Sequence, residues 1–176
     1  MRAKIYIILF IVFLIIYFLA ANFFTWFNLA GIKPNMFVIL VLFIGLFAGR
    51  KVALTYGIIF GIFIDLFTGK SVGVTSVMLG VIGILGGYFD KSFSKDSRMT
   101  MMLMVILSTF IYETGVYKIN SFILSITIEI IAFLKILIIE MLYNAIIMII
   151  LYPLFQRVGY RIEEEFKGSK ILTRYF

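Results

Sequence analysis

The sequence predicts an all-α integral membrane protein with six transmembrane helices and both termini in the cytoplasm. Of its 176 residues, 63% are hydrophobic and the mean hydropathy is +1.13, whereas soluble domains are usually about 45–50% apolar. The apolar residues form long runs, and most basic residues lie between these runs. Because this arrangement is typical of the loops of membrane proteins, the bilayer is the expected solvent.

Residues 1–156 are expected to form one transmembrane domain. Its six spans cover about 5–22, 35–49, 52–67, 72–89, 99–117 and 136–155. The first is longer than the apolar part of a signal peptide, which is about 7–15 residues, so we expect it to remain uncleaved. Aromatic residues typical of a membrane interface follow it: Phe23, Phe24, Trp26 and Phe27.

The second span begins at Pro34, whose missing N–H costs nothing in the first turn of a helix. The uncharged run ends at Gly49, and its roughly 16 residues reach about 24 Å at 1.5 Å per residue. A hydrocarbon core is about 30 Å thick. We therefore expect Lys33 and Arg50 to snorkel toward the membrane surfaces.

The third span ends near Asp65, and the fourth ends at Asp90, before the short charged loop 90–98. After the fifth span, residues 119–135 place polar side chains on one helical face and apolar ones on the other. This pattern predicts an amphipathic helix, interfacial or groove-lining, on the outer side of the membrane. The sixth span follows, and residues 157–176 are expected to form a basic cytoplasmic tail.

The distribution of Lys and Arg favours six spans over seven. With six spans and both termini inside, twelve of the sixteen basic residues lie on the cytoplasmic side and four lie outside. If 119–135 were a seventh span, the division would be eight to eight. Because cytoplasmic loops carry the excess of Lys and Arg, the six-span topology is preferred.

The composition excludes several classes of enzyme. The chain has no cysteine and no histidine, so a disulfide framework, a thiolate nucleophile and a His-based triad are impossible. Asp65 and Asp90 end successive spans on opposite sides of the membrane and cannot form the close carboxylate pair of an aspartyl protease. The net charge of +7 follows the membrane pattern. We expect no cofactor, no metal and no nucleic-acid partner.

Pairs of small residues at helical spacing are the first candidate for a functional feature. Three pairs of glycines are four residues apart: Gly45 with Gly49, Gly57 with Gly61, and Gly83 with Gly87. In a membrane such pairs let two helix backbones approach closely. They accept the helix of a partner, or they pack the second, third and fourth spans together; the sequence leaves both open. Asp65 likewise either binds a partner or is a capped carboxylate at a turn.

Polar residues in the outer half of the last spans are the second candidate, because ionisable groups inside a membrane are costly and often functional. They are Tyr112, Glu113, Tyr117, Glu129, Lys135, Glu140 and Asn144. We expect them to line a polar crevice that opens to the outer face. A structural ion pair of Lys135 with Glu129 or Glu140 is the alternative.

Residues 34–90 resemble the MreD family of bacterial rod shape-determining proteins. The matching residues are Pro34, Gly49-Arg50, Gly57-xxx-Gly61-xxx-Asp65, Gly69-xxx-Gly73 and Gly80-xx-Gly83-xx-Gly86-Gly87-Tyr88. A second patch, Leu142-Tyr143-Asn144-Ala145 ahead of Pro153-Leu154, resembles the last span of that family.

The resemblance implies a non-catalytic scaffold of the cell-elongation machinery in the bacterial cytoplasmic (inner) membrane. Such a scaffold binds MreC and, with MreB, RodA and a class B penicillin-binding transpeptidase, supports lateral peptidoglycan synthesis and rod shape. The resemblance also implies a fold similar to the six-helix substrate-binding subunits of energy-coupling-factor transporters. A vitamin-transport subunit that binds a solute in the outer crevice is therefore the alternative function. Homodimer formation is left open.

Overall fold

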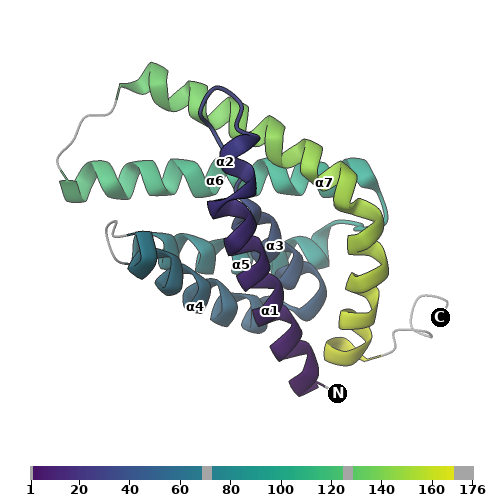
Figure 1. The fold of residues 1–176 in the computed structure, drawn as a ribbon. Coiled ribbons are helices and arrows are strands. Elements are labelled where there is room, and N and C mark those ends of the chain that lie inside the picture. The colour runs from purple at the N-terminus through teal and green to yellow at the C-terminus, as the bar shows by residue number, and fades with distance from the viewer. Residues whose placement is uncertain (1, 69–72, 125–128, 169–176) are drawn as a thin grey trace.

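The computed structural model describes residues 2–68, 73–124 and 129–168, and it is built from helices (Figure 1). They are α1 (Arg2–Ala21), α2 (Phe23–Trp26), α3 (Met36–Ala48), α4 (Arg50–Thr68), α5 (Val74–Ser92), α6 (Arg98–Leu124) and α7 (Ile130–Lys167). Within these residues, five helical segments are long and apolar enough to cross a membrane, and α3 is a shorter apolar helix. The predicted all-α membrane fold is confirmed.

The last two long helices extend further than the sequence suggested. α6 continues to Leu124, and α7 begins at Ile130. A separate amphipathic helix over 119–135 was therefore a wrong prediction, since its start belongs to α6 and its end to α7, while 125–128 lie outside the described residues. Apolar packing between the two helices explains the extension: the Tyr117 ring stacks on Phe133, with 4.2 Å between centroids.

The predicted cytoplasmic tail is also not a separate segment. Residues 157–167 continue α7, and 169–176 lie outside the described residues. Low hydropathy ended the predicted span near residue 155, but a helix continues for as long as its backbone hydrogen bonds and packing are satisfied. Here Ile162 is buried and Gly159 packs against the Phe47 ring, so the end of α7 is part of the fold.

Helix α3 is the buried centre of the molecule. Every residue from Val38 to Ala48 is buried, and α1, α4, α5, α6 and α7 all contact this helix. A helix that is apolar on all sides needs apolar surroundings, and here other helices supply them. The length of α3, about 20 Å, therefore does not have to match the thickness of the bilayer. Lys33, which was expected to snorkel, instead donates a hydrogen bond to Thr25 Oγ1 (2.8 Å).

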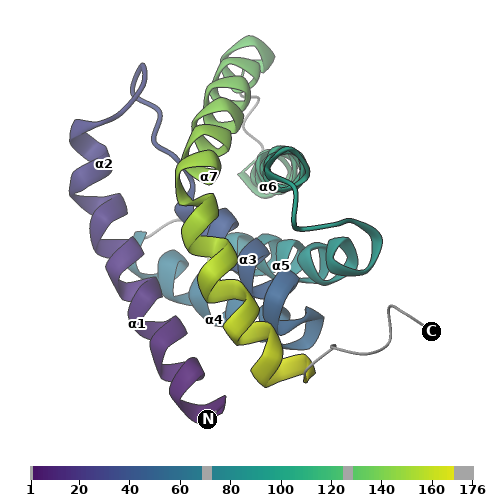
Figure 2. The ribbon, with the colours of Figure 1, turned by 90° about the vertical axis from the view of Figure 1, so that its right-hand side faces the viewer.

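The other helices surround α3 in two groups. α4 and α5 form a closely packed antiparallel pair along α3, whereas α6 pairs with the first half of α7 (Figures 1 and 2). α7 then changes direction, and its second half packs against α3 (Figure 2). Pro153 lies within α7, and a proline removes one backbone hydrogen bond and favours such a bend.

Aromatic side chains attach α1 to the outside of α4. Phe13 is fully buried, and its ring stacks on Phe60 with 4.0 Å between centroids. The Phe63 ring meets Phe13 edge-on at 5.3 Å. Near the N-terminus, the Tyr56 hydroxyl donates to the Tyr6 backbone oxygen (2.8 Å). Large rings therefore separate α1 from α4, whereas α4 and α5 meet through glycines with their backbones in close contact.

Candidate functional site

The glycines of α4 and α5 are covered by the chain's own backbone. A Cβ added at Gly61 would lie 2.2 Å from Ser76 Cα, and one at Gly57 would lie 2.5 Å from the Leu79 oxygen. One at Gly83 would lie 2.6 Å from the Ala53 oxygen. No side chain fits at such distances, so close contact between α4 and α5 requires these glycines.

The same packing continues to α3. A Cβ at Gly45 of α3 would lie 2.8 Å from Gly86 Cα in α5. At the start of α4, Arg50 Cβ would lie 2.6 Å from a Cβ added at Gly87. Gly49 lies between helices, and its φ of +95° allows the tight turn from α3 to α4. The glycine pairs thus pack helices of the chain itself, and no free face for a partner helix is left at Gly45, Gly57, Gly61, Gly83 and Gly87.

Every described helical glycine has an atom of the chain close to the position of an added Cβ, although at Gly80, Gly115 and Gly159 that atom belongs to a side chain. An atom of the chain lies within 3.2 Å of the added Cβ at Gly45, Gly57, Gly61, Gly80, Gly83, Gly86, Gly87, Gly115 and Gly159.

Asp65 joins the end of α4 to the start of α5. Its side chain is buried, and Oδ2 accepts hydrogen bonds from the backbone N–H of Gly73 (2.7 Å) and of Ser76 (3.4 Å). A carboxylate at the C-terminus of α4 opposes that helix dipole, but the same charge is favourable at the N-terminus of α5. Oδ2 of Asp65 thus caps the start of α5, and a partner-binding role for Asp65 stays a prediction.

A buried polar cluster joins α3, α6 and α7 at the end of the molecule predicted to face outward. Asn144 is fully buried. Its Oδ1 accepts from the backbone N–H of Asn35 (2.9 Å), and its Nδ2 donates to Thr109 Oγ1 (2.9 Å). The amide thus connects the start of α3 with the middle of two other helices.

Two carboxyl groups extend this cluster. Glu140, one turn before Asn144, is only 6% exposed, and its side chain lies near Glu113 and Asn35. Tyr112 is also buried, and it lies near Asn35.

The structure brings together four of the seven residues predicted to line an outer crevice: Tyr112, Glu113, Glu140 and Asn144. Tyr117 instead stacks on Phe133, and Glu129 and Lys135 are exposed. The ion pairs among the described residues do not include Lys135. Asn35 was not among the predicted residues, although an Asn directly before an apolar run is a recognised helix-start signal.

An ion-pair cluster at the opposite end was also missed. Lys95 Nζ contacts Asp90 (2.5 Å) and Glu163 (2.9 Å), and Lys167 Nζ contacts Asp90 (2.6 Å). Both ammonium groups donate to the Leu46 backbone oxygen, at 3.1 and 2.9 Å. The cluster therefore joins the ends of α3, α5 and α7 with the α5–α6 loop, and only the four-residue spacing of Glu163 and Lys167 hinted at it.

The charge of Asp90 is stabilised in this cluster. Burial would raise the pKa of its carboxyl group, but hydrogen bonds from Lys167 and Lys95 outweigh burial and hold the pKa below the ordinary value. Nearby, Gln156 Nε2 donates to the Lys95 oxygen (2.6 Å), and the Tyr160 hydroxyl donates to the Asp96 carboxylate. α7 is thereby fixed to the α5–α6 loop.

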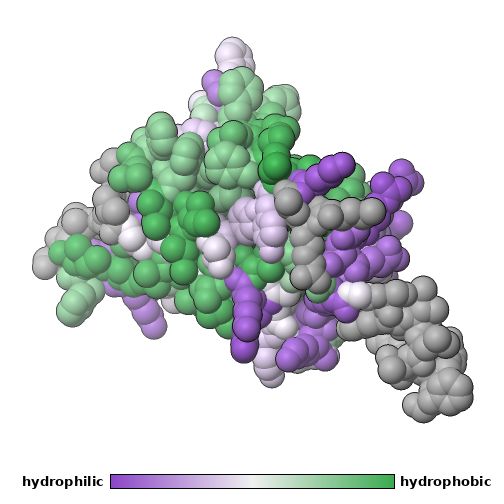
Figure 3. Space-filling model, turned by 90° about the horizontal axis from the view of Figure 1, so that it is seen from below, coloured by the Kyte–Doolittle hydropathy of each residue, from purple (hydrophilic) through white to green (hydrophobic). Residues whose placement is uncertain are grey.

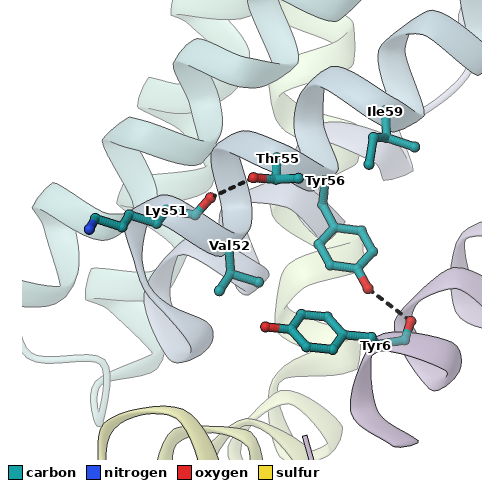
Figure 4. Close-up of a pocket in the computed structure, with 6 residues that line it drawn as sticks. All are labelled: Tyr6, Lys51, Val52, Thr55, Tyr56 and Ile59. Carbon is teal, nitrogen blue, oxygen red and sulfur yellow. Dashed lines mark hydrogen bonds between the residues drawn. The ribbon is translucent and has the colours of Figure 1, made fainter. Parts of the chain in front are cut away.

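Two hollows lie near the same end, on either side of the first turn of α4. One lies between α1 and α4 and is lined by Tyr6, Lys51, Val52, Thr55, Tyr56 and Ile59 (Figure 4). The Tyr6 and Tyr56 rings stack beside it, 6.1 Å apart. The other lies between the start of α4 and the end of α5. Seen from below the view of Figure 1, the molecule has hydrophilic residues on one side and hydrophobic residues over much of the rest of the face (Figure 3).

The comparisons with known proteins give one match. A family model described as rod shape-determining protein MreD matches residues 1–158. The chain belongs to the MreD family. It therefore has a role in rod shape determination, as the resemblance predicted. The match includes the glycine-packed helices and the outer polar cluster, whereas Glu163 and Lys167 lie beyond it. No curated protein and no solved structure matches, so similarity to energy-coupling-factor subunits stays a prediction.

Proposed function

We propose that the chain is a non-catalytic scaffold of the cell-elongation machinery in the bacterial cytoplasmic membrane and that it binds MreC. The observation that carries this proposal is the MreD family match over residues 1–158. MreB, RodA and a class B penicillin-binding transpeptidase are then indirect partners in lateral peptidoglycan synthesis. Binding through the bilayer is consistent with the apolar helices.

We further propose that α1 contacts the transmembrane helix of MreC. The glycine faces are occupied internally, so a partner helix has to pack against larger side chains. Only 11% of the α1 span is buried inside the molecule, against 33% or more for the other long spans. Ile7, Ile11 and Ile15 are exposed and four residues apart, which places them on one face of α1.

The test is co-purification with MreC in a mild detergent. Replacing Ile7, Ile11 and Ile15 together by alanine should reduce the recovery of MreC. A matched variant of α7, with Ile138, Leu142 and Ile146 replaced by alanine, removes a similar exposed stripe and should leave recovery unchanged. Undiminished recovery with the α1 variant would contradict the α1 contact, and no recovery with the wild-type protein would contradict MreC binding itself.

The topology with both termini in the cytoplasm is part of this proposal, and the absence of native cysteine makes it easy to test. Ser92 and Asn28 are exposed and lie on opposite sides in that topology. A membrane-impermeant thiol reagent applied to intact spheroplasts should label Asn28→Cys at once and Ser92→Cys only after permeabilisation. The reverse pattern would overturn the orientation.

One observation favours the alternative function, a substrate-binding subunit of a vitamin transporter. Tyr112, Glu140 and Asn144 are buried polar groups that converge between helices, as ligand sites require. Asn144, however, already uses both atoms of its side-chain amide in bonds to Asn35 and Thr109. A vitamin detected by mass spectrometry in the purified protein, and lost in Asn144→Leu, would favour transport over the scaffold.

A further inference from the structure

We propose that the hollow between the start of α4 and the end of α5 binds the phosphate headgroup of an anionic phospholipid. Its volume is about 920 Å³, within the range of small-molecule sites. The lining comes from three parts of the chain: Ala48, Gly49, Arg50 and Lys51 from the α3–α4 turn, Ile84, Leu85, Gly87, Tyr88, Asp90 and Lys91 from α5, and Lys167 from α7.

The hollow has an excess of positive charge. Asp90 is the one acidic residue of its lining, and Asp90 is already paired with Lys95 and Lys167. Arg50, Lys51 and Lys91 are exposed, and none of the ion pairs among the described residues includes them. Three cations without a carboxylate partner around one concave surface favour an anionic ligand.

Close backbone packing brings these cations together. Arg50 and Lys91 are far apart in the sequence, but Gly87 lies directly against Arg50, where an added Cβ would be 2.6 Å from Arg50 Cβ. Arg50 is also the first residue of α4, and the positive end of that helix dipole adds to the field of the side chains. The geometry is set by rigid helix ends rather than by a loop.

The apolar part of the lining points to a lipid rather than a soluble anion. Ile84 and Tyr88 line the hollow and are exposed on α5. The exposed Val77, seven residues before Ile84, continues the same face of the helix beyond the hollow. Lys91 follows Tyr88 by three residues on the same face. A stripe of apolar side chains that ends in Tyr and Lys suits an acyl chain beneath its headgroup, because Tyr and Lys favour the membrane interface.

The test uses the full-length protein purified in a neutral detergent and titrated with phosphatidylglycerol, with bound lipid counted by native mass spectrometry. The variant Lys51→Gln/Lys91→Gln removes two charges from the hollow. Each lysine near a membrane surface contributes about 1 kcal/mol to anionic-lipid attraction, so we expect an approximately 30-fold loss of affinity, since 1.4 kcal/mol corresponds to tenfold. Phosphatidylcholine should bind much more weakly to the wild-type protein.

The control Arg157→Gln/Arg161→Gln removes two charges from exposed positions of α7 and should keep most of the affinity. Equal losses in both double variants would overturn the site in favour of non-specific attraction, and no loss in the first variant would overturn it directly. Inorganic phosphate at millimolar concentration should not displace the lipid. Displacement would replace the lipid proposal by a site for soluble anions.

Discussion

Replacing Gly61 by alanine tests whether backbone contact between α4 and α5 holds the fold together. The added Cβ would lie 2.2 Å from Ser76 Cα, 2.5 Å from Ser76 N and 2.8 Å from the Thr75 carbonyl carbon. All three are backbone atoms of the facing helix start. Carbon atoms in favourable contact are about 3.5–4.0 Å apart, so the helices would have to separate locally by roughly 1.3 Å or more.

The expected loss of stability follows from three contributions. Overpacking that moves backbone costs about 1–3 kcal/mol, and the short distance at Gly61 favours the upper end. Separation at Ser76 also weakens its bond to Asp65, and loss of a helix cap costs about 1 kcal/mol. Alanine regains about 1 kcal/mol of helix propensity. We therefore expect Gly61→Ala to lower the free energy of unfolding by about 2–3 kcal/mol.

The assay is unfolding by sodium dodecyl sulfate in mixed micelles, followed by circular dichroism. Gly80→Ala is the matched control in α5, because its added Cβ meets only the side chains of Leu54 (3.2 Å) and Ile58 (3.4 Å), which can rotate away. That variant should be as stable as the wild-type protein or slightly more stable. If both glycine variants unfold alike, the account of a glycine-dependent core is wrong.

Three further substitutions are measured in the same assay. Asp65→Ala removes the cap of α5 and should cost about 0.5–2 kcal/mol. Asn144→Leu removes two hydrogen bonds between helices, each worth about 0.6 kcal/mol and up to about 1.7 in membranes, so a loss of roughly 1–3 kcal/mol is expected. Glu163→Gln removes a charged partner of Lys95 and should cost about 1.5–3 kcal/mol, whereas the exposed neighbour substitution Glu164→Gln should change little.

Fold class and helix positions could be predicted because a membrane span has to be apolar and because Lys and Arg concentrate in the loops between spans. Each predicted span lies largely on one helix, from α1 to α7. The extents of α6 and α7 could not be predicted, because hydropathy falls where a helix leaves the apolar layer even if its hydrogen bonds continue. Ring stacking of Tyr117 on Phe133 and burial of Ile162 keep both helices regular there.

The candidate sites show a similar limit. Spacing indicates that Gly57 and Gly61 share a small face, but it does not say which helix covers that face. Asp65 could be placed at a turn, yet its partners are backbone N–H groups of the following helix, which no side-chain pattern reveals. The pairing of Asp90 with Lys167 joins residues 77 positions apart, so it depends on the tertiary fold.

Helix α7 determines where α3 lies in the bilayer, because it holds both ends of that helix. Asn144 accepts from the N–H of Asn35 at the start of α3, and Lys167 donates to the Leu46 oxygen near its end. Asn35 and Leu46 are separated by about 17 Å of helix, whereas Asn144 and Lys167 are separated by about 35 Å. A straight helix alongside α3 could not make both contacts without a large tilt or displacement. The change of direction in α7, within which Pro153 lies, resolves this mismatch, because it lets two groups that are far apart along α7 meet the two ends of the shorter α3.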